Sequence, residues 1–463
     1  MVETVFLFQI TINCWHISVL GNYMTRLSDE FIQSLDSRID GILESCTKCG
    51  ACADVCPTPD IVNLTSSPKQ LGEGIIKILS NKKGTRDAEL WASSCCGSGF
   101  CQSVCEKGIN PRFMLAMARR NISKNENKES RRNKGKAAFQ KMSRGVKVLS
   151  RLQLAPEILE RLSPRSHKEL DKAPDVVFYT GCNMLKTPHI GLLCLDVLER
   201  LELSYEVHGG PATCCGILQF RPGDIENAVR QALTSIERLT KSNCSKILSW
   251  CPTCQIQFTE VASPSYAEIT GNGFGMTMFP VFLSHNLEKL KPLLKHRVSK
   301  RVAIHEYSGE LGVMEAVKML LKAIPGLELV ELGHRSAGYT GTALAPMKDY
   351  LRKSIARTLV SAEELEIDTL VGIYHNDHRE FSGHEAAWNF SVANYMELIG
   401  ESIGISQPDI FKQFKLMRDI DAILESCSDL IQKYSLDIET VRDVIIQDML
   451  NEQNLPIDRG LQS

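Results

Sequence analysis

Residues 176–182, VVFYTGC, together with 213–216, TCCG, and 251–254, CPTC, decide the fold of this chain. VVFYTGC is a short apolar run that is typical of a buried strand, and it ends on Cys182. Strand-like residues also precede the other two stretches, as SYEVHGG and SKILSW, and helix-like residues separate the three. Strands that alternate with helices predict a parallel α/β layer.

The cysteines of these stretches all follow directly after predicted strands. In open α/β sheets the carboxyl ends of the strands form the edge where ligands bind, so thiols far apart in sequence are expected to converge there. Soft sulfur ligands select iron–sulfur clusters, zinc or copper(I). The sequence therefore predicts a metal centre made by Cys182, Cys214, Cys215, Cys251 and Cys254.

The same pattern returns about 123 residues further along, without its thiols. RVAIHEYSG, LELVELGHRSAG and DTLVGIYHNDH match the three cysteine-bearing segments. We interpret this as a duplicated domain with one cysteine-bearing copy and one emptied copy. The glycine of the CCG turn survives as Gly338, and the residues at or near the cysteine positions become Ser308, Ser336, Ala337, Tyr374 and Asp377.

Closer to the N-terminus, Cys46, Cys49, Cys52 and Cys56-Pro57 have the spacing of the bacterial ferredoxin run for a cubane [4Fe–4S] cluster. In that run three thiolates bind one cluster, and the fourth cysteine, followed by proline, crosses to a second cluster. A zinc knuckle is the alternative interpretation.

A second, irregular run follows, in which Ser98 and Glu106 stand where the ferredoxin pattern has cysteine and proline. The two runs together hold eight thiols, the number that two cubanes need. Crossed ligation predicts one site of Cys46, Cys49, Cys52 and Cys105, and another of Cys56, Cys95, Cys96 and Cys101. A single cubane with a three-iron or absent second cluster remains open.

The pattern C-x31-CCG-x34-C-x2-C resembles the CCG domain of heterodisulfide reductases. With the ferredoxin-like run, the chain from about Leu27 to Gly404 resembles the D-type subunits of that family. It is also similar to the iron–sulfur subunits of anaerobic glycerol-3-phosphate dehydrogenase and glycolate oxidase. The resemblance implies a noncubane [4Fe–4S] cluster on the five thiols and two cubanes near the N-terminus. It also implies electron transfer to or from a flavoprotein dehydrogenase or another reductase subunit.

The predicted fold class is α+β and multidomain: a helical two-cluster ferredoxin-like domain, two tandem α/β CCG domains and a helical tail of two or three helices. Residues 1–23 are interpreted as a mis-start or a disordered extension. The Lys/Arg-rich stretch after the first domain is predicted to be a solvated linker, with a docking strip for an acidic partner or a membrane surface as the alternative. The expected boundaries are 24–120, 121–170 (basic linker), 171–298 (CCG domain 1), 299–405 (CCG domain 2, without cysteines) and 406–463.

Composition restricts the compartment and the partners. The 463 residues carry a net charge of −2, so nothing in the overall charge indicates nucleic acid. The apolar run 5–20 is shorter than a membrane span and lacks the basic flank of a signal peptide. Together with 17 clustered cysteines, these features predict a cytoplasmic protein without a transmembrane segment, with peripheral membrane contact left open.

Two enzymatic interpretations and one structural interpretation follow. The first is an iron–sulfur electron-transfer subunit of an oxidoreductase, and the second is a stand-alone heterodisulfide or thiol-conjugate reductase with its active site between the repeats. Because the second copy lacks thiols, cleavage of a disulfide between two such clusters is not expected. A zinc-binding scaffold is the remote alternative.

The emptied copy is rich in imidazole and carboxylate. His375-x2-His378 could form a zinc or iron site, since imidazole suits both metals. The alternative is that these groups fill and hydrogen-bond a vacated cleft. His189, near the first copy's thiols, is interpreted as a hydrogen-bond partner of the cluster or as a structural residue. Cys14, Cys194, Cys244 and Cys427 are predicted to be buried apolar thiols.

Overall fold

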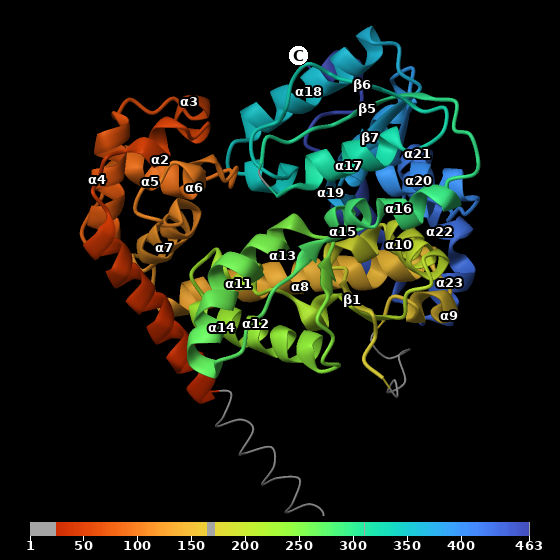
Figure 1. Ribbon diagram of the computed structural model, residues 1–463. Helices are drawn as coiled ribbons and strands as arrows, with labels where there is room; N and C mark the ends of the chain where they lie inside the picture. Colours follow the sequence, from red (N-terminus) through yellow and green to blue (C-terminus); the bar gives the residue numbers. More distant parts are fainter. Residues whose placement is uncertain (1–24, 164–171, 310, 463) are drawn as a thin grey trace, which may run out of the picture.

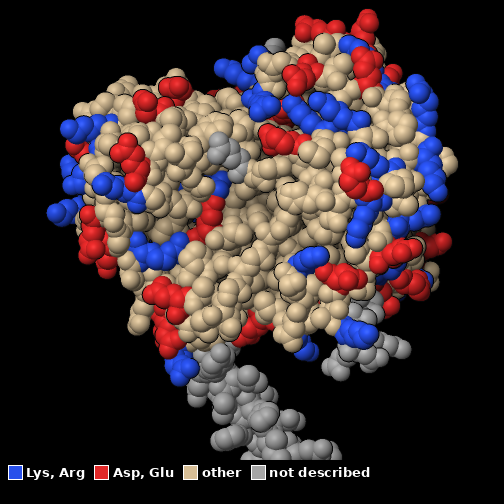
Figure 2. Space-filling model, in the orientation of Figure 1, with Lys and Arg blue, Asp and Glu red and all other residues tan. Residues whose placement is uncertain are grey.

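The computed structural model describes residues 25–163, 172–309 and 311–462, and the predicted mis-start or extension lies outside them. A helical N-terminal lobe lies beside two α/β repeats, which sit one above the other in Figure 1 with the C-terminal helices at one side. No helix among the described residues is both long and apolar enough to cross a membrane. Charged side chains of both signs are interspersed around the face seen in Figure 2, and its middle is largely uncharged.

The N-terminal lobe begins with a helix over residues 25–45. The next long helix starts at a capping box, in which Ser67 and Gln70 satisfy each other's backbone N–H groups, and Pro68 fixes its first turn. Its apolar face is buried in a core that includes Trp91 and Phe113. This helix is α4 Pro68–Leu79. The other helices of the lobe are α2 Ala51–Asp54, α3 Thr58–Ile61, α5 Arg86–Ser93, α6 Phe100–Ser103 and α7 Pro111–Ser123.

The predicted basic linker is instead the longest helix described, α8 Lys128–Gln153. Asn127 caps its start by accepting a hydrogen bond from the Ser130 N–H. Met142, Val146, Leu149 and Leu152 form a buried stripe at helical spacing in its second half. The linker prediction was wrong because the Lys/Arg residues of the first half hid this stripe. A short helix, α9 Pro156–Glu160, follows.

The first repeat contains a four-stranded parallel sheet with the order β2-β1-β3-β4. Each predicted strand is present, and the long predicted helices form α10 Pro188–Arg200 and α12 Ile225–Thr240. The strands are β1 Val176–Tyr179, β2 Tyr205–His208, β3 Ile247–Ser249 and β4 Thr277–Met278. The remaining helices include α11 Ile217–Phe220, α13 Pro252–Ile256, α14 Ser263–Thr270, α15 Phe279–His285 and α16 Leu287–Leu290.

The second repeat has the same topology, a parallel sheet with the order β6-β5-β7-β8. The duplication inferred from the sequence therefore extends to the strand order, and the prediction of a fold that mixes helices with parallel sheets is confirmed. The domain boundaries remain predictions. The elements are β5 Arg301–Ile304, β6 Glu328–Val330, β7 Thr369–Gly372, β8 Ser391–Asn394, α17 Val313–Lys322, α18 Lys348–Glu364, α19 His375–Phe381 and α20 Tyr395–Ile403.

One apolar core runs through both repeats. Phe279 of α15, Val317 of α17 and Ile399 of α20 belong to it together with residues of β1 and β5. Trp250 of the first repeat stacks on Tyr395 of the second, with ring centroids 5.7 Å apart and planes at 5°.

The tail forms four helices rather than two or three, and they pack against α8: α21 Ile410–Met417, α22 Ile420–Ser426, α23 Ser428–Lys433 and α24 Ile438–Ile445.

Candidate metal centres

The three cysteine groups of the first repeat converge at the carboxyl edge of its sheet, as the sequence predicts. Cys182 lies three residues after β1, Gly216 turns the chain after the cysteine pair with a φ of 82°, and Cys251 precedes the first turn of α13. The thiols form a continuous hydrogen-bonded chain in which each contacts the next. Its order is Cys182, Cys214, Cys215, Cys254 and Cys251.

The pKa values in this five-thiol site are shifted chiefly by hydrogen bonds between the thiols and by burial. Hydrogen bonds from the Cys214 and Cys254 thiols lower the pKa of Cys215 to about 6. A hydrogen bond from Cys254 likewise lowers the pKa of Cys251 to about 7. The hydrogen bond that Cys182 donates to Cys214, and then burial, raise the pKa of Cys182. Five sulfur donors exceed the four of a tetrahedral zinc site, so the donor set fits an iron–sulfur cluster better.

The walls of the five-thiol site come partly from a segment that sequence reasoning assigned to a linker. Met142 and Val146 of α8 pack directly against Cys182 and Cys214. From the sheet side, the Tyr179 hydroxyl donates to the Cys254 sulfur at 3.6 Å. Helix α8 thus helps to shield Cys182 and Cys214 from solvent.

In the N-terminal lobe, the first of the two expected thiol groups lies around a cavity of about 220 Å³. Cys46, Cys49, Cys52 and Cys105 all line it. Burial and then the neighbouring Cys46, Cys49 and Cys105 raise the pKa of Cys52 to about 12. Gly50, with a φ of 86°, brings the loop so close to α4 that a Cβ there would lie 2.5 Å from backbone atoms of Pro68 and Lys69. Cys49 is exposed, so this group reaches the surface.

In the second expected group Cys56, Cys96 and Cys101 are buried and Cys95 is half-buried. Burial, followed by the charges of Cys95 and Cys56, raises the pKa of Cys96 to about 11 and also raises that of Cys101. The Trp91 Nε1–H donates to the Cys56 sulfur at 3.4 Å. The two groups of the crossed pattern are therefore the two sets that the structure brings together. Their role as cluster ligands stays a prediction.

Tyr339 connects the second N-terminal group with the five-thiol site, and sequence reasoning did not find it. A Cβ on Gly97 would lie 2.4 Å from the Tyr339 ring. The Tyr339 side chain is also hydrogen-bonded to Thr253, and it lies close enough to Cys251 for the charge of that thiol to affect the pKa of Tyr339. Because Tyr339 belongs to the emptied copy, no cysteine spacing could identify it.

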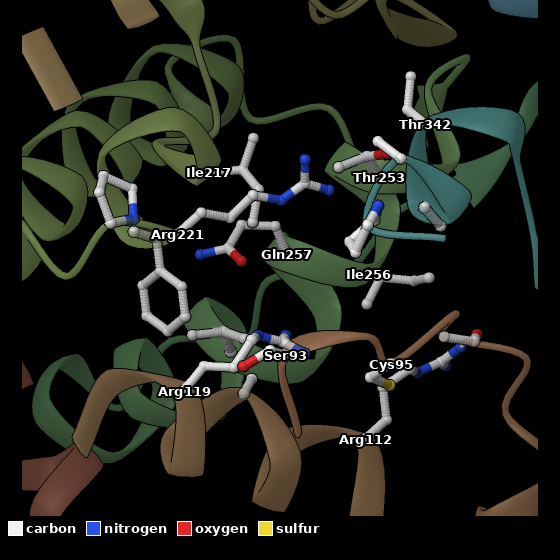
Figure 3. A pocket seen from close by; sticks show the side chains of 18 of the residues that line it. Ser93, Cys95, Arg112, Arg119, Ile217, Arg221, Thr253, Ile256, Gln257 and Thr342 are labelled. Atoms are coloured by element: carbon white, nitrogen blue, oxygen red, sulfur yellow. Dashed lines mark hydrogen bonds between the residues drawn. The ribbon is translucent and has the colours of Figure 1, made fainter. Parts of the chain in front are cut away.

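A pocket of about 420 Å³ opens at this junction (Figure 3). Cys95 and Arg112 line it from the N-terminal lobe, Arg221 and Thr253 from the first repeat, and Tyr339 from the second. The Arg112 guanidinium donates to Glu260 at 2.9 Å through Nε and to the Gly97 carbonyl at 2.7 Å. In Figure 3 the side chain of Arg221 extends into the pocket, and its guanidinium has no ion pair with any residue that the structure describes.

In the emptied copy, two tyrosines and an aspartate occupy three of the vacated cysteine positions. Counted from the strand end, Tyr307 rather than Ser308 takes the position of Cys182, because it lies three residues after β5. Its hydroxyl donates to Asp377 Oδ1 at 2.7 Å, and Asp377 Oδ2 accepts from the Tyr374 N–H at 3.0 Å. Burial raises the pKa of Asp377 to about 6.

Most of the other polar residues predicted here are held by hydrogen bonds, as the second interpretation expects. His305 contacts Thr358 at 3.0 Å, and Ser336 contacts Ser354. Glu306 pairs with Lys318 at 2.7 Å, His334 with the Leu332 carbonyl at 3.0 Å, and His384 with Gln453 at 3.0 Å.

The predicted pair His375 and His378 does not form one site. Among the described residues His378 groups with His189, whereas His375 joins no set of three or more possible metal ligands. His189 therefore faces the second repeat and the tail rather than the five thiols.

Comparison with protein families defines the class. Residues 45–110 match the model of a 4Fe–4S dicluster domain, and residues 176–259 match the model of the CCG cysteine-rich domain. The chain is thus an iron–sulfur, metal-binding protein of oxidoreductase type, with its predicted cysteine runs inside the two matched segments.

Curated proteins that are similar to this chain narrow the class further. The chain is 24% identical over 404 residues to the D subunit of dihydromethanophenazine:CoB–CoM heterodisulfide reductase from Methanosarcina barkeri, covering 79% of this chain and 95% of that protein. It is 26% identical to the D subunit of the same reductase from Methanosarcina acetivorans, covering 69% and 83% of the two chains. The B subunit of the Methanothermobacter marburgensis fumarate reductase (CoM/CoB) is 27% identical over 34% of this chain and 30% of that protein. No solved structure matches the chain. The resemblance to the D-type subunits of heterodisulfide reductase is confirmed.

Proposed function

We propose that this chain is an electron-transfer subunit of an oxidoreductase, with two cubane [4Fe–4S] clusters in the N-terminal lobe and one noncubane [4Fe–4S] cluster on the five thiols. The observation that supports it is the serial arrangement of the three thiol groups. The first reaches the surface at Cys49, and its Cys52 lies near Cys101 of the second. Tyr339 lies between the second and the third. Such clusters accept and release electrons one at a time.

The residues of the chain position and insulate these groups. Crossed ligation would place Cys46, Cys49, Cys52 and Cys105 around the outer cubane, and Cys56, Cys95, Cys96 and Cys101 around the inner one. Arg112 lies beside the inner group and is held by Glu260. Helix α8 and the Tyr179 hydroxyl enclose the five-thiol site.

The partner is expected to bind at the exposed Cys49 side of the lobe. The similar proteins are named as subunits, which supports a multi-subunit assembly. A flavoprotein dehydrogenase or another reductase subunit would exchange electrons with the outer group. Sixteen free cysteines among the described residues agree with a reducing, cytoplasmic setting.

Anaerobic purification with iron and sulfide analysis tests the cofactor content. Three [4Fe–4S] clusters require about 12 iron and about 12 sulfide per chain. Redox titration followed by EPR is expected to resolve three centres, one with a spectrum unlike that of a cubane. Near-stoichiometric zinc with little iron and no sulfide would refute the proposal and favour the zinc scaffold.

The pocket of Figure 3 favours one second candidate, a self-contained disulfide or thiol-conjugate reductase. It lies among the N-terminal lobe and both repeats, next to Thr253 of the CPTC stretch, and Arg221 extends into it. An anionic substrate there would find the Arg221 guanidinium, which has no ion pair within the part of the chain that the structure describes.

Steady-state assays separate the two functions. With reduced viologen as donor and a panel of disulfides, the relay function predicts no turnover by the isolated subunit. Turnover with a KM that rises in Arg221→Gln, but not in the exposed control Arg132→Gln on α8, would establish the second candidate instead.

A further inference from the structure

Four metal-binding side chains from four different helices meet where the two repeats join the tail. His189 lies in α10 of the first repeat, His378 in α19 and Glu397 in α20 of the second, and Asp409 at the start of α21. One possible ligand atom from each lies within 4.8 Å of those of the other three. The two imidazoles are fully buried and Asp409 nearly so, with side-chain exposures of 1%, 0% and 8%.

The imidazoles lack the hydrogen bonds that buried polar groups require. Neither ring nitrogen of His189 is hydrogen-bonded to any residue that the structure describes, and the same holds for Nδ1 of His378. Only Nε2 of His378 is satisfied, by Asp409 Oδ2 at 2.7 Å. Each of these three buried nitrogens has a carboxylate oxygen 3.5–3.8 Å away but no hydrogen bond to a described residue, an arrangement that an ion bound between them would satisfy.

The carboxylates, by contrast, are held in place by helix starts. Glu397 Oε1 accepts the Asn394 N–H at 2.6 Å, and Asp409 Oδ1 accepts the Lys412 N–H at 3.0 Å. The nearby ammonium of Lys412 is paired with Glu385 at 3.2 Å. Two fixed carboxylates place negative charge in this buried cluster, and a divalent cation would balance it.

One ligand atom from each residue lies within 4.8 Å of the others, which is close to the spacing around such an ion. His189 would use one ring nitrogen, either Nδ1, 3.5 Å from Asp409 Oδ1, or Nε2, 3.7 Å from Glu397 Oε1. His378 Nδ1 lies 3.8 Å from Glu397 Oε1. Ligands at about 2.0–2.1 Å around a tetrahedral zinc ion are about 3.3–3.4 Å apart. Small side-chain adjustments would bring this set to that geometry.

We propose that His189, His378, Glu397 and Asp409 bind one zinc ion. The site has four protein ligands and no open position, which is the pattern of a structural zinc. It contains no sulfur, so it would select a different metal from the three thiol groups. Its ligands come from the first repeat, the second repeat and the tail, and the ion would tie these three parts together.

The test uses the full-length chain, purified anaerobically with its iron–sulfur content intact. Zinc analysis is expected to give about one zinc per chain, and X-ray absorption at the zinc edge only N/O neighbours at about 2.0–2.1 Å. His378→Ala should lose this zinc while the iron content and the EPR spectra of the clusters persist. The matched control His375→Ala changes a buried histidine of the same helix outside the cluster and should retain the zinc.

Three results would overturn the proposal: wild-type protein without zinc, sulfur at about 2.3 Å in the zinc shell, or equal zinc loss in both histidine variants. If His378→Ala does not fold, Asp409→Asn keeps the side-chain volume and serves as the second variant. X-ray absorption at the zinc edge of the wild-type protein shows whether the zinc ligands are N/O or S atoms, and this measurement needs no variant.

Discussion

The two repeats have one topology and opposite contents. Both sheets have the same strand order, and both carry a glycine turn after the second strand, with φ of 82° at Gly216 and 81° at Gly338. The first copy fills the strand ends with thiols, whereas the second fills them with the Tyr307–Asp377 hydrogen bond. The fold of this domain therefore does not depend on the thiols, and the second copy has been free to take another role, contact with the N-terminal lobe.

The largest effect is expected from Cys215→Ser in the cysteine-bearing copy. Cys215 is the central thiol of the hydrogen-bonded chain, so its loss should remove the EPR signal of the five-thiol site and activity that depends on the partner subunit. The two N-terminal centres should keep their spectra, because their thiols lie in a separate lobe. EPR of the anaerobically purified variant measures this.

Cys194→Ser is the matched control for that variant. Cys194 is a fully buried thiol of α10 outside the five-thiol chain, as predicted from its isolated position. Its variant should keep all iron. An unchanged spectrum in Cys215→Ser would show that the site assignment is wrong.

A second prediction compares the glycine turns of the two copies. A Cβ at Gly338 would lie 2.6 Å from the Cys96 carbonyl oxygen, and one at Gly216 would lie 2.4 Å from that of Ala228. Left-handed backbone with a side chain costs about 1–2 kcal/mol and overpacking about 1–3, so each Ala variant should lose about 2–5 kcal/mol of unfolding free energy. Denaturant titration measures the loss.

The two glycine variants should differ in which centre changes. Gly338→Ala should disturb the spectrum of the inner N-terminal group, and Gly216→Ala that of the five-thiol site. Gly271→Ala, with a φ of 71° and no atom within 4 Å, has the backbone strain alone and should lose only about 1–2 kcal/mol. If Gly338→Ala altered only the five-thiol spectrum, the contact between the emptied copy and the lobe would be contradicted.

Sequence spacing was sufficient for features that are local or repeated. The strands before each cysteine group, the crossed sets of N-terminal thiols and the duplication all follow from short patterns with a fixed period. Three features depend on contacts between distant elements and left no such pattern. They are the packing of α8, the position of Tyr339 between two thiol groups, and the pairing of His189 with His378.

A third prediction concerns what replaced the thiols. Tyr307→Phe removes the hydroxyl that donates to Asp377 and leaves a buried carboxyl oxygen without that partner. The loss should be about 1–3 kcal/mol of unfolding free energy, with unchanged iron content. Tyr205→Phe removes a comparable hydrogen bond to Glu199, 2.6 Å long, at a half-exposed position and should cost less. Loss of iron in Tyr307→Phe would contradict a purely structural role for this hydrogen bond.

The smallest effect is expected at Ser308, the residue next to the former cysteine position. Its contact with the rest of the second repeat is through the backbone, where its N–H donates to the Ser336 carbonyl at 2.8 Å, and alanine retains that bond. Ser308→Ala should therefore change the unfolding free energy by less than about 0.5 kcal/mol and leave the iron content unchanged. Cys182→Ala in the other copy should lose signal from the five-thiol site. Because Tyr307, and not Ser308, takes the position of Cys182 after the strand, we expect no role for the Ser308 side chain. A loss above about 1 kcal/mol, or any loss of iron, in Ser308→Ala would contradict this.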